Sequence, residues 1–332
     1  MKQLPLFAAV LLAATAVRAE TLTGAGSTFA YPIYSKWSDE YHKVKPDLQI
    51  NYQSIGSGGG IRQFTEKTVD FGATDGPMTD EQILKAGGKV LHLPTVMGAD
   101  IPVFNVAGVD ELRFDGAALA AIFLGKITNW NDPALAKLNP GVKLPDLAIT
   151  VVHRSDGSGT TYCWVDYLSK VSPAWEKTVG RGTSVNWPVG LGGKGNEGVS
   201  GLVQQTPGAI GYVELIYALQ NKMSFGSVRN KSGKFLKASI AGVTAAAAGA
   251  ARHMPKDYRV SITDAPGPNS YPISTFTWLL VYPRNTAGKG AELKGFLRWM
   301  LKDGQAMAPA LGYAPLPATV KAMVAKTIET IQ

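Results

Sequence analysis

Residues 149–160 read Ile-Thr-Val-Val-His-Arg-Ser-Asp-Gly-Ser-Gly-Thr, an apolar run that passes directly into a glycine-rich turn. The apolar part, as far as His153, is typical of a short buried strand. The pattern behind the turn predicts a helix that extends through Leu168. A strand, a glycine turn and a helix in this order form one unit of an α/β fold.

The same order occurs twice nearer the N-terminus. A strand predicted at 21–23 enters the turn 24–29, and a strand at 48–52 ends in the turn 56–60. Helices are expected after both turns. Further strands are predicted at 69–73, 101–106, 209–213 and 273–282. Helix and strand patterns alternate throughout the chain, which predicts the α/β class.

Length and composition indicate a folded protein of about two domains. The 332 residues are 45% hydrophobic and include 33 Lys and Arg against 25 Asp and Glu. The net charge is +8, but the Lys and Arg residues are spread along the chain and form no cluster. We therefore expect no nucleic-acid partner. The single cysteine, Cys163, excludes an internal disulfide and is expected to be a small buried residue.

Residues 1–19 have the features of a secretory signal peptide. Lys2 gives a basic start, 4–17 is an uncharged apolar run, and Ala19 ends a small-residue cleavage site. The alternative is a membrane anchor, but the run is shorter than the ~20 apolar residues that cross a bilayer. We therefore predict cleavage after Ala19 and export of residues 20–332.

The three glycine turns are candidates for an anion site. A helix N-terminus carries unpaired N–H groups and a partial positive charge, and glycine lets a ligand approach the backbone. One such turn alone is more often an ordinary helix cap. Three of them on α/β units, whose strand ends share one crevice, favour an anion site.

Two charged positions refine this interpretation. Arg154 stands at a strand end, where a guanidinium can donate to an oxyanion while Asp156 holds it in place. Asp75 closes the strand 69–73 and is expected to face the same crevice. A carboxylate repels an anion without protons but accepts a hydrogen bond from one that keeps a proton, such as phosphate. A helix or turn cap remains the alternative for Asp75.

Competing motifs lack their context. Residues 193–198 match G-x-G-x-x-G, but we expect no strand before them. The four histidines have no metal-ligand spacing, and no nucleophile with a base is apparent. We therefore predict no metal, no cofactor and no enzymatic activity.

The chain resembles the periplasmic phosphate-binding proteins of high-affinity phosphate ABC transporters. The stretches that carry the resemblance are 23–29, 51–60, 69–75, 125–127 with Trp130, 154–160, 187–198 and 207–214. The resemblance implies a two-lobed type II binding protein with two crossover strands as its hinge. Lobe I would comprise 20–98 plus 272–332, and lobe II 99–271. Such a protein binds inorganic phosphate between its lobes as a monomer and delivers it to an inner-membrane ABC permease.

The resemblance also implies the residues that bind phosphate. They are Thr28, Phe29, Ser57, Asp75, Arg154, Asp156, Ser158, Gly159 and Thr160. Asp75 would accept the phosphate proton, Arg154 would be the charged donor with Asp156 as its partner, and the others would supply donors. No ligand role is assigned to 193–198. Two alternatives stay open: a secreted phosphatase on the same scaffold, and binding of another tetrahedral oxyanion such as sulfate.

Overall fold

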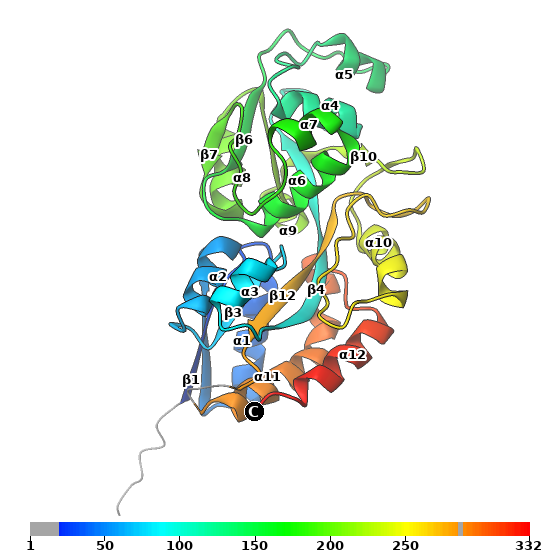
Figure 1. The fold of residues 1–332 in the computed structure, drawn as a ribbon. Coiled ribbons are helices and arrows are strands. Elements are labelled where there is room, and N and C mark those ends of the chain that lie inside the picture. The colour runs from blue at the N-terminus through cyan, green and yellow to red at the C-terminus, as the bar shows by residue number, and fades with distance from the viewer. Residues whose placement is uncertain (1–19, 285–287) are drawn as a thin grey trace, which may run out of the picture.

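The computed structural model describes residues 20–284 and 288–332, so the predicted signal peptide, residues 1–19, lies outside the described residues. Strands and helices alternate along the chain, which confirms the α/β prediction. Figure 1 shows two α/β bodies, one above the other, with strands β4 (Leu91–Phe104) and β12 (Ser274–Val281) running between them. We refer to them as the lower and the upper body.

The lower body has a sheet whose strands follow the order β2-β1-β3-β12-β4. Strand β1 (Glu20–Gly26) pairs in parallel with β2 (Leu48–Ser54) and β3 (Phe71–Thr74), and β12 pairs antiparallel with β3 and β4. The helices are α1 (Tyr31–Val44), α2 (Ser57–Thr65), α3 (Asp80–Lys85), α11 (Gly290–Lys302) and α12 (Ala318–Ile328). In α1, Tyr34, Trp37 and Tyr41 fall at helical spacing and are buried.

The upper body continues the sheet through β8 (Ala209–Glu214), β6 (Thr150–Arg154) and β7 (Leu191–Gly193). A small sheet of β5 (Arg113–Phe114), β10 (Ser227–Arg229) and β11 (Phe235–Leu236) lies beside it, and β9 (Ser224–Phe225) pairs with β4. Its helices are α4 (Gly116–Phe123), α5 (Pro133–Leu138), α6 (Gly159–Val171), α7 (Pro173–Thr178), α8 (Gly195–Gln205) and α9 (Leu215–Gln220). Helix α10 (Ile240–Arg252) packs against β4, β12 and α12. Within 20–284 and 288–332, none of the helices combines the length and the apolar character that crossing a membrane requires.

Two expectations were wrong. A short strand, β7, does precede the 193–198 motif, because residues 191–193 pair in parallel with β6 although Leu191 and Gly192 are exposed. Strand β4 begins at Leu91 and not at 101, because its first part pairs with β12 and is buried almost throughout. The prediction missed that first part, where His92, Pro94, Thr95 and Gly98 interrupt the apolar pattern.

Strand β4 changes its partner at Asp100. Its pairing with β12 ends at Ala99, and its pairing with β8 begins at Asp100, opposite Glu214. The Asp100 side chain is fully buried, and among the described residues neither carboxyl oxygen has a hydrogen-bond partner of ordinary geometry. Burial raises the pKa of Asp100 well above its usual range, the charge of Asp75 adds to this, and the nearby thiol of Cys163 opposes it. Cys163 is buried, as predicted.

Replacing Asp100 by Val should stabilise the protein. An unfolded chain ionises this carboxyl near pH 4, whereas the fold keeps it protonated, so its presence costs more stability as the pH rises above about 4. We expect Asp100→Val to raise the free energy of unfolding by about 1–3 kcal/mol near neutral pH, and less near pH 4. Urea unfolding at the two pH values measures this, with the exposed Asp110→Val as control. Equal or lower stability of Asp100→Val at neutral pH would contradict it.

Candidate functional site

The three glycine turns meet where the two bodies touch. The N–H of Gly58, at the start of α2, donates to the carbonyl of Gly157 before α6 at 2.8 Å. A Cβ atom placed on Gly159 would lie 2.5 Å from both Asp75 Oδ2 and Ser57 Oγ. Only glycine fits at position 159 in this arrangement, because real Cβ atoms do not approach so closely. The N–H of Gly56 donates to the carbonyl of Gly26 in the first turn at 2.8 Å, so the three turns predicted from sequence lie together.

Asp75 lies at the centre of this site and is only 1% exposed. Its Oδ1 accepts hydrogen bonds from Ser27 Oγ at 2.5 Å and Thr277 Oγ1 at 3.0 Å. Its Oδ2, the oxygen that faces Gly159, accepts one from Ser57 Oγ at 3.3 Å. Burial raises the pKa of Asp75 to about 6, although these hydrogen bonds and the charge of Arg154 act to lower it. The carboxyl group is therefore ionised at neutral pH, and its Oδ2 has capacity for another donor.

The Arg154 guanidinium is fixed by Asp156, as predicted. Its Nε donates to Asp156 Oδ1 at 2.8 Å and its Nη2 to Oδ2 at 2.6 Å, while Nη1 donates to Thr160 Oγ1 at 3.1 Å. The Arg154 side chain is 1% exposed. Burial acts to raise the pKa of Asp156, but the bonds and charge of Arg154 outweigh it, and the pKa is lowered. This two-bond geometry holds a positive charge close enough to Asp75 to lower its pKa.

The first turn of α6 presents donors to the site. Ser158 caps the helix, because its Oγ accepts from the N–H of Thr161 at 2.9 Å, and its own N–H donates to the carbonyl of Thr183 at 2.7 Å. The next two N–H groups, of Gly159 and Thr160, stand where a helix offers no internal acceptor. These two groups are thus available to a ligand, whereas the backbone N–H of Ser158 is already used.

The backbone carbonyl groups of Thr28 and Phe29 are fixed by hydrogen bonds from two tyrosine hydroxyls. The Thr28 carbonyl accepts from Tyr217 OH at 2.6 Å, and the Phe29 carbonyl accepts from Tyr313 OH at 2.5 Å. Both residues are buried. Because trans peptide groups point N–H and C=O in opposite directions, these tyrosines help to fix the direction of the neighbouring N–H groups.

Sequence reasoning missed three residues of the site. Ser27 lies inside the turn 24–29 and donates to Asp75. Thr277 also donates to Asp75, and the hydroxyl residues within the otherwise apolar strand β12 could have indicated a polar role for it. Asn196, at the start of α8, donates to the hydroxyl oxygens of both Thr28 and Thr160. The motif 193–198 had no assigned role, but through Asn196 it reaches the site. Recognising the strand β7 at the start of this motif would have indicated another strand end followed by a helix start.

The site combines many N–H and O–H donors with one paired guanidinium and one carboxylate. In the described part of the chain, no group of three or more His, Cys, Asp or Glu side chains could hold a metal ion. His153 lies beside Arg154, but its ring stacks on Trp187 and its Nδ1 lies 3.0 Å from the Arg154 carbonyl. Chemically, the arrangement suits an oxyanion that carries a proton of its own.

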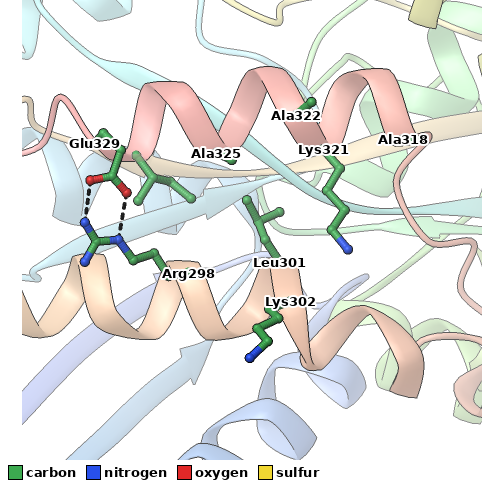
Figure 2. A pocket seen from close by; sticks show the side chains of 9 residues that line it. Arg298, Leu301, Lys302, Ala318, Lys321, Ala322, Ala325 and Glu329 are labelled. Atoms are coloured by element: carbon green, nitrogen blue, oxygen red, sulfur yellow. Dashed lines mark hydrogen bonds and ion pairs between the residues drawn. The ribbon is translucent and has the colours of Figure 1, made fainter.

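A separate groove of about 500 Å³ runs between α11 and α12 (Figure 2). Its apolar lining consists of Leu301, Ala318, Ala322, Ala325 and Ile328. At one end Arg298 pairs with Glu329, and Lys302 and Lys321 complete the lining. None of the predicted site residues lines this groove, so the two features are independent.

The chain matches known sequences over most of its length. A family model described as a PBP superfamily domain matches residues 13–303. The phosphate-binding protein PstS of Pasteurella multocida is 47% identical over 312 residues, which cover 92% of this chain and 89% of the relative. The PstS protein of Xylella fastidiosa is also 47% identical, over 89% of this chain and 81% of the relative.

Solved structures share the fold. A phosphate-binding protein from Stenotrophomonas maltophilia superposes with a TM-score of 0.71 at 20% identity, covering 92% of this chain and 93% of the other. A putative phosphate ABC transporter substrate-binding protein from Clostridium perfringens, solved with bound phosphate, gives 0.67 at 19% identity, over 90% and 100%. The fold is therefore that of the two-lobed type II periplasmic binding proteins, as expected.

Removing the Arg154 guanidinium should raise the pKa of Asp156. In Arg154→Met the burial of Asp156 persists and the hydrogen bonds and charge of Arg154 are lost, so that the weaker bond from the Gly195 N–H remains to oppose burial. We expect its pKa to move from below to above the ordinary value, as measured by carboxyl carbon NMR during a pH titration. Arg298→Met, which breaks the exposed pair with Glu329, is the control. An Asp156 pKa that stays low in Arg154→Met would show that another group sets it.

Proposed function

Because the chain belongs to the PstS family of phosphate-binding proteins, we propose that it binds inorganic phosphate where the two bodies meet and delivers it to an ABC-type import permease. The single observation that carries this proposal is the buried, ionised Asp75 among hydrogen-bond donors. Family membership supports phosphate as the ligand, since the relatives are named for binding it.

The proposal assigns the ligand contacts as follows. Backbone or hydroxyl donors come from Thr28, Phe29, Ser57, Ser158, Gly159 and Thr160. Arg154 supplies the charge, with Asp156 as its partner. Asp75 Oδ2 accepts a hydrogen bond from the O–H group that monohydrogen or dihydrogen phosphate keeps at neutral pH, whereas sulfate has no O–H group to offer. Ser158 would contribute its hydroxyl, since its backbone N–H already donates to Thr183.

The two bodies would act as lobes that close on the ligand. We propose lobe I as 20–98 plus 272–332 and lobe II as 99–271, with β4 and β12 as the hinge. The change of partner along β4 at Asp100 supports a boundary near 99. The contact of Gly58 with Gly157 joins the proposed lobes directly. Phosphate, by bonding to both, would stabilise the closed arrangement.

The protein would act outside the cytoplasm. Residues 1–19 would direct export and be removed, leaving the protein in the periplasm. It would act there as a monomeric carrier with no chemical step. The position of His153 supports this, because stacking on Trp187 and the contact of its Nδ1 with a backbone carbonyl occupy the histidine nearest to Arg154 in sequence.

Calorimetric titration of ligand-stripped protein with phosphate and with sulfate tests the proposal. We expect tight binding of phosphate with one ligand per chain, and much weaker binding of sulfate. Absence of phosphate binding, or equal affinity for the two anions, would contradict it. Release of phosphate from a phosphomonoester by the purified protein would support the phosphatase alternative instead.

Asp75→Asn should relax the preference for phosphate. The amide offers sulfate a donor and removes the charge, so we expect the ratio of phosphate to sulfate affinity to fall about 10- to 100-fold. In the wild type, Asp75 becomes protonated as the pH falls through about 6. The affinity of the wild-type protein for sulfate should therefore rise as the pH falls through this value. The sulfate affinity of Asp75→Asn should stay flat. Asp39→Asn, at an exposed position, is the control. An unchanged ratio would exclude the proton-acceptor role.

Gly159→Ala should weaken phosphate binding at least about 10-fold, because the added methyl group would meet Asp75 Oδ2 and Ser57 Oγ before the lobes close. Gly201→Ala, in α8 where a Cβ atom has open space, is the matched control. Calorimetry gives the affinities, and thermal unfolding checks the fold. Equal phosphate affinity of Gly159→Ala and wild type would contradict the proposed closed arrangement.

A further inference from the structure

Asn196 lies between the two halves of the candidate site. It is fully buried near the N-terminus of α8 in the upper body. Its side chain reaches Thr28, before α1 in the lower body, and Thr160, in the first turn of α6. It therefore contacts one proposed phosphate-binding residue in each body, Thr28 in the lower and Thr160 in the upper.

The orientation of the Asn196 amide is fixed by a backbone group. Its Oδ1 accepts from the N–H of Glu214 at 2.9 Å, and a backbone N–H can only donate. The other atom of the amide is therefore the nitrogen. That nitrogen donates to Thr28 Oγ1 at 2.8 Å and to Thr160 Oγ1 at 3.2 Å.

Each of the two threonine hydroxyls receives a second donor. Thr28 Oγ1 also accepts from the backbone N–H of Asn196 at 3.3 Å, and Thr160 Oγ1 also accepts from Arg154 Nη1 at 3.1 Å. A hydroxyl oxygen has two lone pairs and one hydrogen. Both lone pairs of each oxygen are thus occupied by nitrogen donors that cannot accept a bond in return.

From this pattern we infer that Asn196 is a positioning residue that orients the hydroxyl hydrogens of Thr28 and Thr160 toward the ligand. Each hydroxyl can then act toward a bound group only as a donor. This inference rests on the proposed phosphate binding and deepens it. Both donors to Thr160 Oγ1 lie within the upper body, so a phosphate oxygen would meet one hydroxyl whose direction is set before the ligand arrives, and less ordering is needed there on binding.

Asn196 also has a consequence for the closed state. Its bonds to Thr28 cross between the two bodies, whereas its bond to Thr160 stays within the upper one. Thr28 Oγ1 gains both of its donors from Asn196, so its hydrogen becomes oriented only when the bodies meet. Closure and the completion of the donor set are then one event.

A double-mutant cycle on phosphate affinity tests the inference. Asn196→Leu removes the amide without adding charge, and the pair Thr28→Val with Thr160→Val removes both hydroxyls with little change of shape. We expect Asn196→Leu to weaken phosphate binding about 10-fold in the wild-type background. In the background that lacks both hydroxyls, it should change affinity by less than about twofold. The exposed Asn131→Leu is the matched control.

The outcomes are distinct. If wild-type protein binds phosphate and the effect of Asn196→Leu is the same in both backgrounds, Asn196 has only a structural role and the inference is overturned. If the wild type does not bind phosphate, the proposed function fails, and the inference fails with it.

A second measurement does not depend on any variant folding. Neutron diffraction of the wild-type phosphate complex locates the hydroxyl hydrogens of Thr28 and Thr160. We expect both to point to phosphate oxygens and the Asn196 amide hydrogens to point to the threonine oxygens. A hydroxyl hydrogen directed at Asn196 would overturn the inference.

Discussion

The site depends on one electrostatic constraint, a carboxylate that stays charged although it is buried. Asp75 is buried, and burial alone would protonate it, but three hydroxyl donors and a nearby guanidinium hold its pKa at about 6. A negative charge of this kind is costly unless it is paired or hydrogen-bonded. The surrounding donors satisfy part of this requirement, and a protonated anion would satisfy the rest. The same charge repels an anion that has no proton.

The fold brings these groups together from distant parts of the chain. Strands β1, β2, β3 and β6 each end at the site, and glycine turns or a helix start follow them. Strand β12 adds Thr277 from the far end of the sequence. The long strand β4 belongs to both bodies, since it pairs with β12 before Asp100 and with β8 from there on. The proposed opening and closing of the site would be a rotation of the two bodies around this strand.

Local patterns predicted much of this arrangement. Strand ends and helix starts are short-range features of a sequence. They predicted the glycine turns, the position of Asp75 and the two hydrogen bonds from Arg154 to Asp156. Asn196 and Thr277 were missed because their roles arise from contacts across 168 and 202 residues of sequence. The first part of β4 was missed for a similar reason: its pairing with β12 buries residues that single-sequence periodicity does not mark. Tertiary pairing overrides local preference at such places.

The central claim is that Asp75 accepts a hydrogen bond from a protonated oxygen of the ligand. A high-resolution crystal structure of the phosphate complex measures this most directly. The account predicts a phosphate oxygen about 2.6 Å from Asp75 Oδ2, the length of a charge-assisted O–H···O bond. A phosphate whose oxygens all lie beyond hydrogen-bonding distance of Asp75, or a carboxyl group turned away from the ligand, would contradict it.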